Sequence, residues 1–565
     1  MEKNTSHHVE RRSRDGTYDG IELHPYFHEN NWDLARLTES AQSAIAREHA
    51  LSFREAVKYW PKALFFSIGI STTLVMEGYD TGLINSFFGL PQFRQFYGQE
   101  LPDGTYQFSL AWQSAISSMA SVGGIFGLLL AGQIVDRIGY RWTMFFGLAW
   151  LTAAIFLTFF AQNVRMLFVG NLLCGVPWGI FQSVASSYAI DTAPLVLRPL
   201  MTSYISLCWA MGQFISTGVL KGLLNREDQW AYRIPFAIQW FWPIPLAIIT
   251  AFAPESPWYL VRKGQMAEAR QALRRLGSKY TTEDQLDNNV AMIYVTNEHE
   301  RMIEQGTSYL ELFRGVNLRR TEVAVGAWIC QVTCGNWFGG NVTYFMEQAG
   351  ASAYTAFAFG LGMNAVSCIG TIASWFLTPR VGRRPMYLWG LVGMLATLLT
   401  VGFLGIPSPT SVKLSWACGG ILILNMLLYF LTVGPVCFTI VPEVPAARLR
   451  NKTVAVARAA YNVCGIGASF LNPAILNPLA WNLKAKGGLV WSGFCILSVV
   501  WVYFRFPETK GRTPLELDTL FERKTRTRDF GTTHIDATEM ADAAVADTAQ
   551  VSTKVVEAQK LEVEA

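Results

Sequence analysis

The stretch GQIVDRIGYR (132–141) recurs in shortened form as PRVGRR (379–384), and the two copies divide this chain into two related halves. Each copy follows an apolar segment and carries arginines around a glycine. Two further pairs recur in the same order: DTAPLVLRP (191–199) with PEVPAARLRNK (442–452), and PESPWYL (254–260) with PETKGRT (507–513). Three motifs repeated in one order indicate an internal duplication.

The composition places these motifs between membrane-spanning helices. Of the 565 residues, 51% are hydrophobic and only 16% are charged, against roughly a quarter in soluble domains. A helix needs about 20 apolar residues to span the hydrocarbon core. Twelve stretches qualify: 63–88, 109–131, 142–161, 166–190, 200–222, 234–253, 322–346, 354–378, 385–405, 414–440, 454–474 and 488–506. We therefore expect an all-α membrane protein with twelve transmembrane helices in two six-helix halves.

The polar segments define the expected domains and orientation. They predict an N-terminal tail (1–61), a first half (62–253), a central linker with helices (254–321), a second half (322–506) and a largely disordered tail (507–565). Lys and Arg are concentrated in the connections that follow even-numbered helices. Because positive charge favours the cytoplasmic side, both termini are expected there.

Several other classes of function find no support. No basic stripe with interleaved aromatics suggests nucleic-acid binding. No phosphate loop, zinc-protease motif or metal cluster appears, so we expect no enzyme, cofactor or metal site. The nine cysteines lie in apolar segments, where they behave as small hydrophobic residues. The polar N-terminus does not have the pattern of a secretory signal peptide.

Three ionisable residues fall deep inside predicted spans: Glu77, Asp80 and Arg458. Each costs about 2.5 to 3.5 kcal/mol at the centre of a membrane helix, so such residues should face a cavity or the bundle interior. Glu77 and Asp80 are three residues apart and share one helix face. If Arg458 neutralises one carboxylate, the other is left to bind and release a proton. The alternative is a buried ion-pair cluster that only fixes helix packing.

The motifs resemble the major facilitator superfamily, and its sugar-porter branch in particular, over about residues 60–520. Five segments resemble the fungal α-glucoside (maltose-type) permeases more closely: MEGYDT (76–81), GVPWGIFQ (175–182), LCWAMGQ (207–213), GPVCFTIVPEVPAARLRNKT (434–453) and AWNLKAK (480–486). This resemblance implies a plasma-membrane carrier that imports a sugar together with a proton. We expect it to act as a monomer.

The resemblance also implies roles for individual residues. Asp80 matches the proton site of the family, with Glu77 and Arg458 as its matched partners. Matched positions predict sugar contacts at Gln182, Gln213, Asn336, Asn341, Tyr344, Phe438, Tyr461 and Asn462. For each of these, the alternative is a role in helix packing or interhelical hydrogen bonding. Trp178 and Trp209 are expected to pack.

The charged loop motifs predict a cytoplasmic gate. Asp136, Arg137 and Arg141 are expected to pair with Glu255 and Arg450, and these ion pairs would close the inner side. The alternative is that these charges only fix the orientation of the chain in the membrane. Positive charge on the cytoplasmic side would explain the arginines, but it would not explain Asp136 and Glu255.

The chain also departs from its relatives. Asn171 stands where sugar porters have Arg, and Gly124 where α-glucoside permeases have Glu. The change at Asn171 also fits the α-glucoside branch. Gly124, together with Phe438 where many sugar porters have Trp, keeps open a carrier of the same fold for a non-sugar metabolite. A transporter-like sugar sensor is a third alternative.

Overall fold

The computed structural model describes residues 24–30, 32–102, 104–304, 308–406, 412–446, 449–510, 512 and 514–533. The predicted disordered tail therefore lies mostly outside the described residues. Contacts divide the chain into two compact units. The smaller unit comprises Met1–Phe65, Asp191–Leu197 and Pro254–Gln305, and the larger unit comprises Phe66–Ile190, Arg198–Ala253 and Gly306–Ala565.

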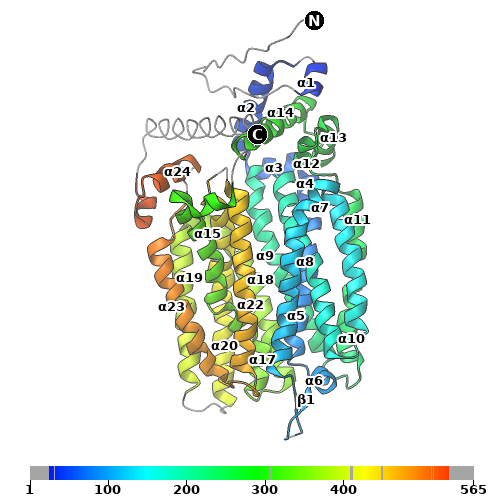
Figure 1. The fold of residues 1–565 in the computed structure, drawn as a ribbon, viewed down its shortest axis with the longest axis vertical. Coiled ribbons are helices and arrows are strands. Elements are labelled where there is room, and N and C mark those ends of the chain that lie inside the picture. Colours follow the sequence, from blue (N-terminus) through cyan, green and yellow to red (C-terminus); the bar gives the residue numbers. More distant parts are fainter. Residues whose placement is uncertain are drawn as a thin grey trace, which may run out of the picture. The chain divides into compact units, whose positions relative to one another are not determined.

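The larger unit is a bundle of long helices that run alongside one another (Figure 1). Its first half contains α4 (Pro61–Ser71), which begins in the smaller unit, α5 (Thr73–Phe87), α6 (Pro91–Tyr97), α7 (Leu110–Phe159), α8 (Val164–Thr192), α9 (Arg198–Leu223), α10 (Trp230–Ile238), η2 (Gln239–Phe241) and α11 (Pro243–Phe252). A small antiparallel hairpin, β1 (Gln99–Glu100) with β2 (Tyr106–Gln107), pairs Gln99 with Gln107.

The second half begins with η3 (Tyr309–Phe313). It continues with α15 (Gly315–Thr333), α16 (Asn336–Gly340), α17 (Val342–Gln348), α18 (Ala353–Val381), α19 (Arg383–Leu404), α20 (Val412–Leu428), η4 (Tyr429–Val433), α21 (Gly434–Glu443), α22 (Arg450–Leu476), η6 (Lys484–Lys486), α23 (Gly487–Arg505), α24 (Pro514–Glu522) and η7 (Thr527–Gly531). Figure 1 places α6 and α17 at one end of this bundle and α24 at the other. We call these the α6 end and the α24 end.

The smaller unit is built from helices that range from the three-residue η1 to the 22-residue α14. They are α1 (Pro25–Glu29), α2 (Leu34–Ala50), α3 (Phe53–Tyr59), η1 (Leu195–Leu197), α12 (Pro257–Arg262), α13 (Met266–Leu276) and α14 (Glu283–Glu304). Helix α2 packs along α14, and Arg270 forms ion pairs with Glu283 and Asp287 that join α13 to α14. The helices predicted in the central linker are thus present.

Eight helical segments of the described chain are long and apolar enough to cross a membrane. The difference from the twelve predicted spans has identifiable causes. The spans 109–131 and 142–161 share the single helix α7, whereas 63–88 and 322–346 are each divided into shorter helices. The span 200–222 corresponds to α9, which is long but more polar.

Glycines set how these helices turn and approach one another. Gly139 has a φ of 85°, so the two parts of α7 meet there without a loop. Gly382, with a φ of 100°, joins α18 to α19 at the equivalent place in the second half. Helices α5 and α9 touch through Gly78 and Gly212, where an added Cβ would lie 2.2 Å and 2.1 Å from a backbone oxygen of the facing helix.

Two helices of the second half are irregular. Residues 315–348 are interrupted at Gly335, which has a φ of 85°, and again at Asn341. The π-helix η4 interrupts the segment from α20 to α21. Gln331 links both features, since its Nε2 donates to Gly434 O at 3.0 Å and its Oε1 accepts from Tyr429 Oη at 3.2 Å. Irregular backbone of this kind is tolerated in membrane helices where protein or a cavity surrounds it.

Candidate functional site

A chain of polar side chains crosses the centre of the bundle. Gln182 of α8 donates from Nε2 to Glu77 Oε1 of α5 at 2.5 Å, and its Oε1 accepts from Arg458 Nη2 of α22 at 2.8 Å. Glu77 is 6% exposed, and its second carboxylate oxygen is buried without a hydrogen-bond partner among the described residues. We call Glu77, Gln182 and Arg458 the central relay. It joins the first half of the chain to the second.

The relay differs from a direct ion pair. The sequence suggested that Arg458 neutralises a carboxylate, whereas the guanidinium reaches Glu77 through the amide of Gln182. Both polar atoms of Gln182, a predicted sugar contact, are occupied by this bridge.

Asp80 lies one turn further along α5 and has different partners. Trp178 Nε1 donates to Asp80 Oδ2 at 3.1 Å, and Gln239 Nε2 donates to Asp80 Oδ1 at 2.8 Å. Both donors are neutral and belong to the first half. Sequence reasoning assigned Trp178 to packing and passed over Gln239. The sequence signal that could have identified Gln239 was its polar side chain within an otherwise apolar predicted span.

Aromatic rings surround the arginine of the relay. The Arg458 guanidinium lies 4.5 Å from the ring centroid of Trp328 and 4.7 Å from that of Tyr461. Phe438 packs edge-on against Trp328 at 5.1 Å between centroids. Cation–π contacts of this type stabilise a guanidinium that has lost water. The predicted sugar contacts Phe438 and Tyr461 thus share this cluster with Trp328, which was not predicted.

Three other predicted sugar contacts are half-buried side chains on separate helices. Gln213 lies on α9 beside Gly82 of α5, Asn336 begins α16, and Asn462 follows Tyr461 on α22. None of the three side-chain amides has a hydrogen bond to another described residue, so each is available to a ligand.

A pocket with polar walls lies between the two halves. We call it the polar pocket. It is lined by Asn85, Phe88, Gln113, Ser117, Asn341, Tyr344, Ser469, Asn472, Pro473 and Leu476. Two of the predicted sugar contacts, Asn341 and Tyr344, therefore face the same cavity. Asn341 Nδ2 also donates to Trp337 O at 2.8 Å, which fixes the helix interruption beside the pocket.

Contacts between the halves close the bundle at the α6 end. Arg94 of α6 forms an ion pair with Glu347 of α17, and each side chain is only 12% exposed. Asn477 Nδ2 donates to Gln113 Oε1 at 2.6 Å and to Phe108 O at 2.9 Å. We call these contacts the closure. They adjoin the polar pocket, because Gln113 belongs to both and Asn477 directly follows Leu476.

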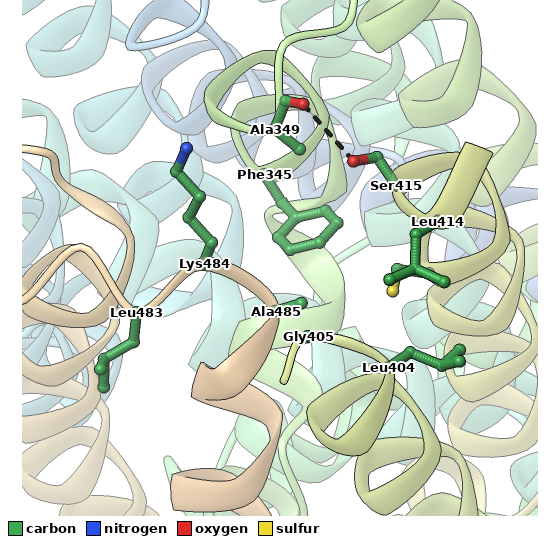
Figure 2. Close-up of a pocket in the computed structure, with 10 residues that line it drawn as sticks. Phe345, Ala349, Leu404, Gly405, Leu414, Ser415, Leu483, Lys484 and Ala485 are labelled. Carbon is green, nitrogen blue, oxygen red and sulfur yellow. Dashed lines mark hydrogen bonds between the residues drawn. The ribbon is translucent and has the colours of Figure 1, made fainter. Parts of the chain in front are cut away.

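A mostly apolar pocket lies on another side of α17. Figure 2 shows lining residues of this pocket, among them Phe345 of α17, Ala349 directly after this helix, and Leu404, with Ser415 Oγ donating to Ala349 O at 3.4 Å. Helix α17 therefore separates two small cavities, a polar one between the halves and an apolar one within the second half.

The predicted gate residues lie elsewhere, and the structure links them only partly. Asp136 and Arg137 are exposed on α7, and neither they nor Arg450 form an ion pair with any described residue. Arg141 donates from Nη2 to Ala251 O at 2.7 Å, at the end of α11. Glu255 belongs to the smaller unit, where it accepts a hydrogen bond from the backbone N–H of Ser256 at 3.1 Å.

The repeated motifs make equivalent contacts in the two halves. Ser256 Oγ donates to Asp191 Oδ2 at 2.7 Å, and Thr509 Oγ1 donates to Glu443 Oε2 at 2.6 Å. Arg384 Nη2 donates to Tyr503 O at 2.9 Å, as Arg141 does to Ala251 O. The internal repeat read from the sequence is thus also a repeat of side-chain contacts.

Comparisons with known proteins agree with this arrangement. The general alpha-glucoside permease of Saccharomyces cerevisiae is 39% identical over 514 residues, which cover 90% of this chain and 83% of the permease. Maltose permease MAL31 of the same yeast is 38% identical over 520 residues, covering 91% and 84%. The xylose transporter XylE from E. coli, in a partially occluded inward-open conformation, matches with a TM-score of 0.65 and 18% identity, covering 80% of this chain and 100% of XylE.

The family assignment rests on a family model that covers most of the chain. The model of the family described as "Sugar (and other) transporter" matches residues 66–521. These residues include the central relay, the polar pocket and the closure. The chain is a multi-pass membrane protein that transports sugar rather than an enzyme, and it belongs to the sugar transporter family with the major facilitator fold.

Proposed function

We propose that this protein imports an α-glucoside such as maltose together with a proton, across the plasma membrane, by alternating access. In this proposal it is a monomer with twelve transmembrane helices, six in 62–253 and six in 322–506. The N-terminal tail (1–61), the central linker (254–321) and the C-terminal tail (507–565) are cytoplasmic. The names of the yeast relatives support the substrate class, and the placement of Lys and Arg supports the orientation. The α6 end then faces outward.

The central relay is the observation that carries the proton coupling. Glu77 lies in the first half and Arg458 in the second, so the bridge through Gln182 must lengthen or break when the halves move apart. A proton on Glu77 removes a buried charge and weakens the attraction to Arg458. Proton binding at Glu77 would thereby be linked to the movement of the halves. Asp80 is held by neutral donors within one half and would serve as a second proton site.

Sugar binding is assigned to the interior between the halves. We infer contacts from Gln213, Asn336, Asn341, Tyr344, Phe438, Tyr461 and Asn462, whose amides, hydroxyls and rings suit a neutral polyol. Gln182 would contact sugar only after releasing one partner of the relay. The closure then represents the outward barrier. Asp136, Arg137, Arg141, Glu255 and Arg450 would form the inner gate in the opposite state.

The proposal is tested by uptake of labelled maltose, sucrose and glucose into cells that make only this carrier. We expect accumulation of maltose that a protonophore abolishes, and alkalinisation of the medium when maltose is added to de-energised cells. Glu77→Gln keeps a hydrogen-bonding group that cannot ionise, and Asp80→Asn does the same at the second site. Both variants should lose accumulation yet retain exchange of bound maltose.

Asp228→Asn provides the matched control, because Asp228 is an exposed partner of Arg226 outside the relay. It should accumulate maltose like the wild type. Uptake without proton movement at any pH would show that the carrier is a facilitator and that the relay is structural. An absence of uptake for all three sugars would contradict sugar import and favour the metabolite carrier or the sensor.

A further inference from the structure

The polar pocket has the composition expected for a neutral, hydroxyl-rich ligand. Its volume of about 20 Å³ in this closed conformation admits only a water molecule, so a sugar ring would enter it once the α6 end opens. Its walls offer the amides of Asn85, Gln113 and Asn472 and the hydroxyls of Ser117 and Tyr344. The ring of Phe88 and the side chain of Leu476 add apolar surface. No charged side chain lines this pocket, so an ionic ligand would find no counter-ion there. Sugar rings need this mixture of hydrogen-bonding groups and apolar faces.

One wall residue has an unused hydrogen-bonding atom. Asn472 is 3% exposed, and its Nδ2 donates to Trp337 O at 3.1 Å. Its Oδ1 is buried and has no hydrogen-bond partner among the described residues. Leaving a buried acceptor unpaired is costly, so a ligand hydroxyl that donates to this oxygen would gain more than an ordinary hydrogen bond.

The polar pocket is also well separated from the central relay. Glu77 and Asn85 are eight residues apart on α5, which corresponds to about 12 Å along a helix. A single hexose ring is shorter than this distance. One ring in the polar pocket therefore cannot also contact the relay and the aromatic rings around Arg458, whereas a ligand of two linked rings can extend from one toward the other.

We infer that the polar pocket is the subsite for one glucosyl ring of a disaccharide, contacted by Asn85, Ser117 and Asn472, while the second ring lies toward the relay. This inference rests on the proposed function and names the part of the site that distinguishes a disaccharide from a monosaccharide. Asn85 and Ser117 come from the first half and Asn472 from the second, so the ring would be held by both halves.

The test compares a disaccharide with a monosaccharide in the same variants. Asn85→Ala and Ser117→Ala each remove a pocket group that has no hydrogen bond to another described side chain. Ser118→Ala is the matched control, because the Ser118 hydroxyl donates to Ser114 O of its own helix at 2.7 Å and does not line the pocket. The measurements are the KM for labelled maltose, the inhibition of that uptake by glucose, and the surface amount of each variant from a C-terminal tag.

We expect each pocket variant to raise the KM for maltose about three- to tenfold, the effect of losing one neutral hydrogen bond. Inhibition by glucose and the properties of Ser118→Ala should not change. If one variant fails to reach the membrane, the other carries the test. Equal weakening of maltose uptake and of inhibition by glucose, or no change in either, would overturn the assignment of this subsite. If the wild type still imports maltose in that case, the proposed function itself stands. Absence of disaccharide import by the wild type would overturn both.

Discussion

The ion pair between Arg94 and Glu347 should control which way the carrier opens, and Arg94→Ala is the change that tests this. The pair joins α6 of the first half to α17 of the second. It must separate before the polar pocket can open at the α6 end. The pair therefore stabilises the closed state at this end and contributes nothing to the open one.

The size of the effect follows from burial. Each side chain is 12% exposed, so water screens the pair only weakly. Removing one partner of a buried ion pair costs about 3 to 5 kcal/mol, because the other charge is left unpaired. Since about 1.4 kcal/mol corresponds to a tenfold change in an equilibrium constant, Arg94→Ala should shift the ratio of open to closed states at the α6 end by at least about 100-fold.

Cysteine labelling measures this shift directly. Ser117 lines the polar pocket, so Ser117→Cys should react slowly with a membrane-impermeant thiol reagent added outside intact cells. Addition of Arg94→Ala should accelerate the reaction strongly. The background is low because seven of the nine native cysteines are buried, and the parent chain without Ser117→Cys measures the contribution of Cys368 and Cys464.

A charge exchange separates the ion pair from a general loss of stability. Arg94→Glu combined with Glu347→Arg restores opposite charges in reversed order and should return labelling toward the slow rate. If Arg94→Ala labels as slowly as its parent, or if the exchange labels as fast as the single variant, the pair does not control opening.

Three further predictions concern the relay, the inner gate and the helix turns. Gln182→Leu removes two hydrogen bonds to charged groups, each worth about 1.5 to 3 kcal/mol. Maltose entry should then alkalinise the medium less for each sugar molecule taken up. Unchanged proton movement would contradict a role of the relay in coupling. Asp136→Ala and Arg450→Ala should lower the maximal rate of uptake with little change in KM, and the reverse pattern would exclude a gate. Gly382→Ala introduces a Cβ at a φ of 100° and 2.8 Å from Glu508 Oε2, so the melting temperature of the detergent-solubilised protein should fall by several degrees. Gly132→Ala is the control. Its added Cβ has nothing within 4 Å, so the melting temperature should not change.

The fold was largely predictable because its signals are local. Apolar segments near the length of a bilayer and short motifs repeated in the same order can each be recognised from neighbouring residues. The interruptions at Gly335 and Asn341 were missed, because an apolar window does not reveal whether a helix is continuous. The break between the spans 354–378 and 385–405 was predicted, and the structure places it at Gly382. What the sequence did not reveal is that this turn takes a single residue.

The site was predictable only as a set of candidates. Glu77, Asp80 and Arg458 stood out because charge is rare inside a membrane span. Their pairing could not be derived, since it depends on which helices face one another. The polar-pocket residues Gln113 and Ser117 are four apart and therefore share one helix face. That spacing identifies a face but not the helix opposite it. The predicted roles in sugar binding of all eight residues, Gln182, Gln213, Asn336, Asn341, Tyr344, Phe438, Tyr461 and Asn462, stay predictions.

The one-residue turns at Gly139 and Gly382 have a mechanical consequence. Two helices that meet at a single glycine cannot slide past each other by a helical turn, as helices joined by a long loop can. Arg141 and Arg384 further tether these corners to the ends of α11 and α23. The two helices that meet at each turn should therefore keep their relative orientation and move together as one rigid body. Bending during transport would then concentrate in the interrupted segment 334–341. The helix pairs joined at Gly139 and Gly382 would move as rigid bodies, and this segment would be the hinge.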